Sequence, residues 1–217
     1  MPLPQVTIPQ RFSSPFDVVV LAASLGGMHA LRQILSALPA RFPAPIIVVQ
    51  HLSSTYPSHL AELLRPHTAL PVSWAQQGER IRPGHIYLAP AKHHLLVSAH
   101  HTFRLSEASP VQYVRPAADV LLQSVATLYR ERAIGVILTG GGRDGALGIQ
   151  AIKRNGGRVL AQDKPTAEKF DMPGAAIHTG CVDFVLPLST LAPALVSLVM
   201  VPGAAALLRV PYATVAS

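Results

Sequence analysis

Short apolar runs alternate along the chain with longer segments whose apolar residues recur at helical spacing. The runs have the length and the β-branched content of buried strands in a parallel sheet. They lie at 18–22, 46–49, 71–75, 134–138, 158–161 and 182–186. The clearest helical segment is 27–38, in which the apolar residues from Leu31 to Leu38 share one face. This alternation predicts an α/β fold in three layers, with a mostly parallel sheet flanked by helices.

Further helices are predicted where periodic segments are bounded by proline, glycine or charged residues. They lie at 57–65, 116–130, 144–155, 173–178 and 188–199. Pro116 suits the first turn of its helix, where no backbone N–H is needed. The middle of the chain changes character, because three short strands at 85–89, 95–98 and 102–105 are joined by turns. We predict a small antiparallel hairpin insertion there, or an antiparallel edge of the sheet.

The length of 217 residues suits one large domain. We assign 17–200 to that domain, 1–16 to an N-terminal arm or linker remnant, and 201–217 to an apolar C-terminal tail. An exposed apolar tail is a candidate contact surface for a homo-oligomer.

The chain has the features of a cytoplasmic protein. Its start lacks the basic and apolar regions of a secretory signal, and the single cysteine, Cys181, excludes an internal disulfide. No charged residue lies between Phe184 and Leu208, but three prolines interrupt this stretch. Stable membrane insertion is therefore not expected.

The formal net charge is +7, from 18 Lys and Arg against 11 Asp and Glu. This excess predicts an acidic partner surface or a general attraction to anions. Nucleic acid fits poorly, because the arginines are scattered and few aromatic residues stand between them.

No cofactor or metal ion is expected. A dinucleotide fingerprint would need glycine at positions 22 and 24, where Ala22 and Ser24 stand. The pairs His93-His94 and His100-His101 lack a partnering cysteine or acid cluster. We expect them to be solvated histidines in turns.

Three polar residues follow three different predicted strands. Ser24 follows 18–22, His51 follows 46–49, and Asp144 lies beyond 134–138. The carboxyl ends of parallel strands meet at one edge of a sheet, where ligands bind. A serine hydroxyl needs an imidazole to take its proton and a carboxylate to orient that imidazole, so the three could form a catalytic triad.

Each of the three also has a simpler interpretation. Ser24 could cap the helix that follows it, and Asp144 could cap the helix at 144–155. His51 could simply form a hydrogen bond in a loop. Only their convergence at one sheet edge favours catalysis.

The loop at 139–145 contains three successive glycines, Gly140 to Gly142. Their backbone N–H groups suit an oxyanion hole beside a reacting carbonyl, and they would equally suit a phosphate. A flexible connector is the plain alternative.

Several segments, in this order, resemble the catalytic domain of the CheB-type chemotaxis protein-glutamate methylesterases. They are 23–27 (ASLGG), 49–51 (VQH), 84–90 (GHIYLAP), 115–121 (RPAADVL), 135–140 (GVILTG), 144–146 (DGA) and 172–173 (MP). The resemblance runs from about residue 17 to 199. It implies a doubly wound sheet and a hydrolase that cleaves glutamate γ-methyl esters on the cytoplasmic helices of chemoreceptors. Some family members also deamidate receptor glutamines.

The resemblance places the nucleophile, base and orienting acid of the family on Ser24, His51 and Asp144. It points to an oxyanion and substrate loop formed by Leu25, Gly26, Gly141 and Gly142, with Arg143 and Met172 on the substrate side. The family commonly has threonine where Leu25 stands and methionine where Gly141 stands.

The 16 residues before the domain leave no room for the receiver domain that is usual in the family, so we expect a domain that works without one. The alternative to an enzyme is a binding protein: a non-catalytic, esterase-like module that binds a receptor or another partner.

Overall fold

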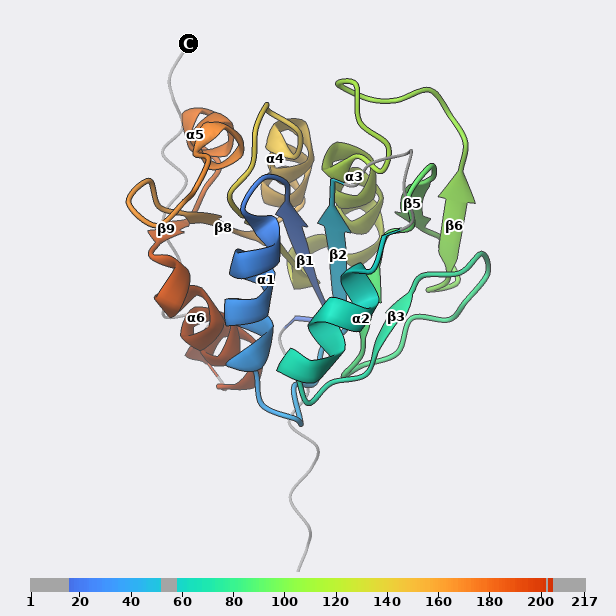
Figure 1. Cartoon of the computed structure of the whole chain (residues 1–217), viewed down its shortest axis with the longest axis horizontal. Helices are drawn as coiled ribbons and strands as arrows, with labels where there is room; N and C mark the ends of the chain where they lie inside the picture. The colour runs from blue at the N-terminus through green and yellow to red at the C-terminus, as the bar shows by residue number, and fades with distance from the viewer. Residues whose placement is uncertain (1–15, 52–57, 202, 205–217) are drawn as a thin grey trace, which may run out of the picture.

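A seven-stranded parallel sheet forms the centre of the computed structural model, which describes residues 16–51, 58–201 and 203–204. The strand order is β3-β4-β2-β1-β7-β8-β9, and every neighbouring pair is parallel. Figure 1 shows β1 and β2 side by side near the middle of the molecule. The strands are β1 (Val18–Ala23), β2 (Ile46–Gln50), β3 (Val72–Trp74), β4 (Ile86–Leu88), β7 (Ala133–Ile137), β8 (Arg158–Gln162) and β9 (Phe184–Leu186). The strand order reverses at β1, which makes the sheet doubly wound.

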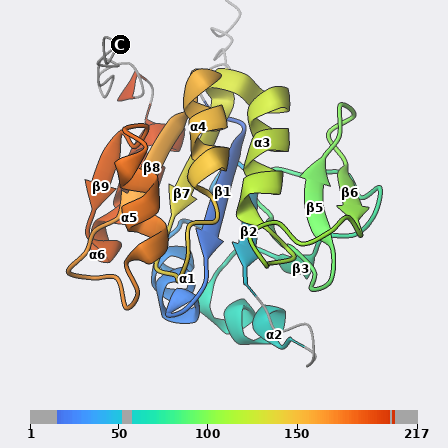
Figure 2. The ribbon, with the colours of Figure 1, turned by 90° about the horizontal axis from the view of Figure 1, so that it is seen from above.

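Helices cover both faces of the sheet (Figure 2). They are α1 (Gly27–Ser36), α2 (Leu60–Leu64), α3 (Ala118–Tyr129), α4 (Ala146–Arg154), α5 (Asp171–His178) and α6 (Leu188–Met200), with short 3₁₀ turns η1 (Arg65–His67) and η2 (Arg130–Arg132). Alternate residues of β1 enter different cores, because side chains alternate across a strand. Val19 and Leu21 pack with α1, α2 and α6, whereas Val18 and Val20 pack with α3, α4 and α5. The predicted three-layer α/β fold is confirmed.

A separate antiparallel pair, β5 (His94–Val97) and β6 (Phe103–Ser106), packs on α3. The hairpin insertion is therefore present. The strand predicted at 85–89 also exists, but its assignment to the antiparallel insertion was wrong. Ile86–Leu88 is an interior strand of the parallel sheet, next to the edge strand β3 and paired with β2 on its other side, and all three residues are buried. Its closeness in sequence to the hairpin misled the prediction, whereas its unbroken apolar run is typical of a parallel strand.

Other boundaries differ by a few residues. Pro116 precedes the N-cap Ala117 and is not in the first turn of α3. Among the described residues, the helix predicted at 57–65 begins at Leu60 and continues as η1. The predicted arm, apart from Phe16, and most of the apolar tail lie outside the described residues. Within the described ranges, no helix has both the length and the apolar character needed to cross a membrane.

Helices α3 and α4 are joined by a reciprocal cap at their N-termini. The Asp144 carboxylate, just before α4, accepts hydrogen bonds from the N–H groups of Ala118 (2.6 Å) and Asp119 (2.9 Å) in the first turn of α3. In return, Asp119 accepts a hydrogen bond from the N–H of Gly148 in α4 (2.8 Å). Each acid thus satisfies N–H groups that the other helix leaves without partners, which fixes the two helices relative to each other.

Burial changes the acidity of Asp119, which is only 2% exposed. Burial raises the pKa of the Asp119 carboxyl, the hydrogen bond from Gly148 lowers it, and the negative charge of Asp144 raises it further; the balance is a raised pKa. The sequence places Asp119 in the first turn of a helix, and the approach of α4 that makes it a buried, bridging group depends on the tertiary fold.

Replacing Gly148 with alanine is expected to loosen this joint. A Cβ atom there would lie 2.5 Å from Leu122 Cβ and 3.2 Å from Asp119 Cα, so α4 would have to move away from α3. We expect a loss of about 1–3 kcal/mol in the free energy of unfolding, measured by urea denaturation. Gly141→Ala is the matched control, because its methyl group would meet nothing within 4 Å. Equal stability of the two variants would contradict the tight α3–α4 contact.

Replacing Asp119 with asparagine should alter how stability depends on pH. Because the pKa of Asp119 is raised in the folded protein, the native state holds this proton more tightly than the unfolded chain does. The resulting stabilisation is complete below the unfolded pKa of about 3.9 and is lost as the pH rises through the folded pKa. The unfolding free energy of the wild type minus that of Asp119→Asn should therefore fall as the pH is raised from about 4.

This difference can be measured by urea denaturation across a pH series. Glu131→Gln, on the exposed turn η2, removes one carboxyl group elsewhere and serves as the control. A difference for Asp119→Asn that grows with pH would show that the folded protein favours the ionised form.

Candidate active site

Three loops at the carboxyl edge of the sheet bring the predicted site residues together. The loop after β1 carries Ser24, the residue after β2 is His51, and the loop after β7 leads to Asp144. The N–H of Ser24 donates to the carbonyl of Thr139 (3.0 Å), and the N–H of His51 donates to the carbonyl of Ala23 (3.0 Å). These bonds continue the pairing of the parallel strands into the loops and hold the three loops side by side.

His51 and Asp144 form a direct hydrogen bond of 2.7 Å between Nε2 and Oδ2. The pair is largely removed from water, since the side chains are 12% and 3% exposed. Asp144 already accepts hydrogen bonds from two backbone N–H groups, so its carboxylate acts as an acceptor and the Nε2–H of His51 is the donor. This tautomer leaves Nδ1 of His51 as the basic nitrogen.

The simpler interpretation of Asp144, a cap on its own helix, is wrong. The N-cap of α4 is Gly145, with a φ of 97°, and no side chain caps that position. Asp144 instead caps the neighbouring helix α3 while it holds His51.

Ser24 does not cap α1 either. The N-cap of α1 is Gly26, with a φ of 77°, and it has no side-chain cap. The carbonyl of Ser24 is fixed by Gln50 Nε2 (2.7 Å) and by the N–H of Gly27 (2.9 Å). Ser24 and His51 line one open cavity of about 610 Å³, together with the start of α1 and Glu168. Within the described residues, no hydrogen bond joins the Ser24 side chain to His51.

The glycine loop has a rigid start and an open tip. The N–H of Gly140 donates to the carbonyl of Lys169 (2.8 Å), and the carbonyl of Gly140 accepts the N–H of Met172 (2.9 Å). A side chain at Gly140 would collide with Met172 Sδ and with Ser24 Cβ. Met172 is fully buried beneath the loop, so it supports the site by packing. Gly140 is required here because two segments approach its Cα closely.

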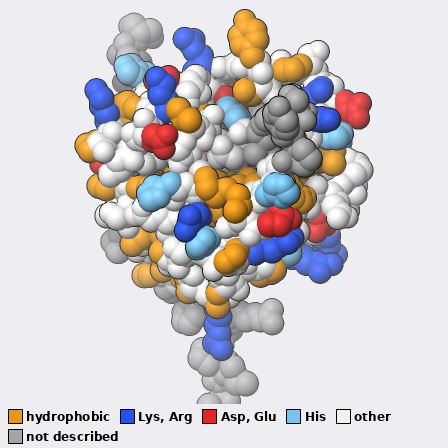
Figure 3. Space-filling model, viewed as in Figure 1, with side chains coloured by type: hydrophobic (Ala, Val, Ile, Leu, Met, Phe, Trp, Pro, Cys, Tyr) orange, Lys and Arg blue, Asp and Glu red, His pale blue; other side chains and the backbone are white. Residues whose placement is uncertain are grey.

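The tip of the loop and the residue after Ser24 face solvent. A Cβ atom at Gly141 or at Gly142 would meet nothing within 4 Å, and Arg143 is exposed. Leu25 is 57% exposed. Figure 3 shows the face of the molecule that α1 and α2 form. On this face apolar side chains lie among several Lys, Arg and His side chains. Of the predicted oxyanion and substrate loop, Leu25 and Gly26 line the cavity, and Gly26 packs closely against Glu168. Gly141, Gly142 and Arg143 are not among the described residues that line this cavity, and Met172 is buried.

His94 differs from its prediction as a solvated turn residue. It is 1% exposed in β5, where Nδ1 accepts the N–H of Ala117 (3.2 Å) and Nε2 donates to the carbonyl of Ser109 (3.1 Å). The missed signal was the apolar run Leu95–Val97 that follows it and makes it part of a strand. Among the described residues, no group of three or more His, Cys, Asp and Glu side chains could hold a metal ion.

Comparisons with known proteins identify the family of this chain. Residues 19–195 match the family model described as CheB methylesterase. The solved catalytic domain of the Thermotoga maritima CheB methylesterase is 40% identical and superposes with a TM-score of 0.82, over 85% of this chain and 99% of that one.

Several curated proteins are also similar. A Moorella thermoacetica protein named protein-glutamate methylesterase/protein-glutamine glutaminase is 43% identical over 191 residues, which are 86% of this chain and 45% of that protein. The Myxococcus xanthus protein-glutamate methylesterase FrzG is 41% identical over 89% of this chain and 58% of its own length. The chain thus spans about half the length of these relatives. A match to the family model over most of its length, together with this identity, shows that the chain belongs to the CheB methylesterase family.

Proposed function

We propose that this protein hydrolyses glutamate γ-methyl esters on the cytoplasmic helices of methylated chemoreceptors, and deamidates receptor glutamines at the same site. The observation that carries the proposal is the buried hydrogen bond between His51 and Asp144 at the edge of the cavity that Ser24 also lines. The names of the relatives support the choice of substrate. No cofactor is needed for this chemistry.

In the first half of the reaction, Ser24 Oγ attacks the ester carbonyl. Nδ1 of His51 takes the hydroxyl proton, and Asp144 stabilises the imidazolium that forms at 2.7 Å from its carboxylate. The imidazolium then protonates the departing methoxy oxygen, and methanol leaves an acyl-enzyme on Ser24.

The second half repeats these transfers with water as the nucleophile. His51 takes a proton from water, the hydroxide attacks the acyl carbonyl, and the returned proton restores the Ser24 hydroxyl. The product is a receptor glutamate. A glutamine side chain follows the same course with ammonia as the leaving group, because both reactions pass through a tetrahedral intermediate.

The oxyanion of that intermediate needs N–H groups that the fold does not already use. Gly27 donates to Ser24 and Gly140 donates to Lys169, so neither is available. We assign the donors to the N–H groups of Leu25 or Gly26 on one side and of Gly141 or Gly142 on the other. Both pairs lie in the loops that meet at Ser24, and backbone N–H groups directed at a developing negative charge stabilise it strongly.

The net charge of +7 favours an acidic partner such as a glutamate-rich receptor helix. Arg143, exposed at the tip of the glycine loop, is placed to contribute to this attraction. Action on the cytoplasmic helices of receptors requires a cytoplasmic location for the enzyme.

The competing function is a non-catalytic module that binds a receptor or another partner. The exposed Leu25 beside Ser24 favours it, because an apolar side chain on the rim suits binding and supplies no hydroxyl to the oxyanion. A fluorophosphonate probe separates the two functions, since it labels an activated serine and leaves an inert one unmodified.

Ser24→Ala should abolish methanol release from a methylated chemoreceptor. Loss of the nucleophile removes covalent catalysis, so kcat should fall by about 10⁴-fold or more. Release of labelled methanol measures the rate, and Ser36→Ala, at the far end of α1, is the matched control. Wild-type turnover by Ser24→Ala would refute the proposed nucleophile.

Asp144→Asn should reduce both activity and stability. The amide cannot orient and stabilise the His51 imidazolium as a carboxylate does, so kcat should fall by about 10³–10⁴-fold. Asparagine also has one acceptor oxygen fewer for the N–H groups of Ala118 and Asp119, which should cost about 1–3 kcal/mol of unfolding free energy.

Ser24→Ala serves as the comparison for Asp144→Asn, because it should change stability by less than about 0.5 kcal/mol. Methanol release and urea denaturation measure the two effects. Full stability of Asp144→Asn would contradict the capping role of Asp144.

A further inference from the structure

A strained turn between Val111 and Val114 lies near His51, and the proposed reaction does not use it. The backbones of Val111 and Val114 exchange two hydrogen bonds, of 3.1 and 3.0 Å, and enclose Gln112 and Tyr113. Both enclosed residues have positive φ angles, of 48° and 67°. Such two-residue turns usually contain glycine, asparagine or aspartate, because other side chains are strained in this conformation.

Side-chain hydrogen bonds hold this turn in place. Gln112 Nε2 donates to Oδ2 of the buried Asp119 (2.8 Å), so the turn is tied to the joint between α3 and α4 that also holds Asp144. At the base of the loop, Arg115 donates to the carbonyls of Glu107 (2.6 Å) and Ala108 (3.0 Å). A strained conformation with this much support is typical of a functional segment.

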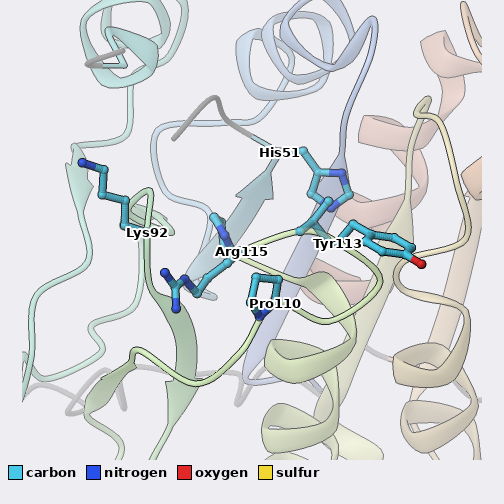
Figure 4. Close-up of a pocket in the computed structure, with 7 residues that line it drawn as sticks. His51, Lys92, Pro110, Tyr113 and Arg115 are labelled. Carbon is cyan, nitrogen blue, oxygen red and sulfur yellow. The ribbon is translucent and has the colours of Figure 1, made fainter. Parts of the chain in front are cut away.

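The turn presents one aromatic ring, that of Tyr113, to solvent. Tyr113 is fully exposed, although its backbone is fixed. It lines a cavity of about 190 Å³ that also includes His51, Lys92 and Arg115. Figure 4 shows Tyr113 and His51 labelled at this cavity, with the tyrosine hydroxyl directed away from the imidazole. The described residues that line the cavity include two cations and no carboxylate.

We propose that the turn of Gln112 and Tyr113 is a recognition arm for the acidic receptor helix that carries the ester, an inference that rests on the proposed function. The Tyr113 ring packs against the aliphatic stems of side chains next to the modified glutamate, while Lys92 and Arg115 attract its acidic neighbours. Tyrosine is enriched among residues that dominate binding, since its large ring loses little conformational entropy. Because Asp119 holds both the arm and Asp144, the receptor helix is positioned relative to His51.

The test compares two substrates, the methylated cytoplasmic fragment of a chemoreceptor and a small aryl acetate ester that cannot reach the arm. Tyr113→Ala should lower kcat/KM for the receptor fragment by about tenfold. This loss should exceed any loss on the small ester by at least about fivefold. Tyr113→Phe keeps the ring and should restore most of the activity. Val185→Ala, an exposed apolar residue on the opposite edge strand β9, should behave as the wild type.

Binding gives a second measurement that does not depend on turnover. In the Ser24→Ala background, adding Tyr113→Ala should raise the Kd for the methylated fragment by about tenfold, as measured by calorimetry. An unchanged Kd, or equal losses of kcat/KM on both substrates, would overturn the recognition arm. A wild-type protein that releases no methanol would refute the proposed function, and the Kd comparison would still decide the role of Tyr113.

Discussion

The Asp144 carboxylate is the constraint on which the candidate site and the surrounding fold both depend. One of its oxygens binds His51, and its two oxygens together accept the first N–H groups of α3. A buried carboxylate is costly unless it is fully hydrogen-bonded, and here three donors surround it. Asp144 precedes α4, and its two hydrogen bonds to α3 stabilise the contact between these helices. The same two bonds hold the carboxylate in the orientation that binds the His51 imidazole. The rotamer of Asp144 is therefore set by the packing of two helices, independently of any substrate.

The position of Ser24 depends on a different set of bonds. The N–H of Ser24 donates to the carbonyl of Thr139, and the carbonyl of Ser24 accepts a hydrogen bond from Gln50. The N–H of His51 donates to the carbonyl of Ala23. The relative placement of the serine and the imidazole is thus set by the register of β2, β1 and β7, and it does not require a hydrogen bond between the two side chains. The fold itself therefore fixes both residues, which is the kind of organisation that the proposed acyl transfer requires.

The sequence predicted the layers of the fold and the convergence of Ser24, His51 and Asp144, because both follow from local patterns. Buried parallel strands are short apolar runs, and their carboxyl ends share one edge. The missed features all depend on contacts between distant segments. From the sequence alone, Ile86–Leu88 was assigned to a hairpin, because its partners β2 and β3 are distant in the chain. His94 was predicted to be solvated, because the sequence does not show that β5 packs against α3. Asp119 resembles an ordinary first-turn acid, and only the approach of Gly148 makes it a bridge between helices. The roles of the site residues in catalysis remain predictions.

The packing around the site divides it into a fixed floor and a variable rim. Gly140 and Met172 belong to the floor, where a single added methyl group would collide with Ser24. Leu25, Gly141 and Tyr113 belong to the rim, where side chains meet water and substitution strains no neighbour. A side chain added at Gly140 would displace Ser24, whereas a change at Leu25, Gly141 or Tyr113 leaves the backbone position of Ser24 unaltered. The packing therefore allows the side chains of the rim to change while the arrangement of Ser24, His51 and Asp144 below them is retained.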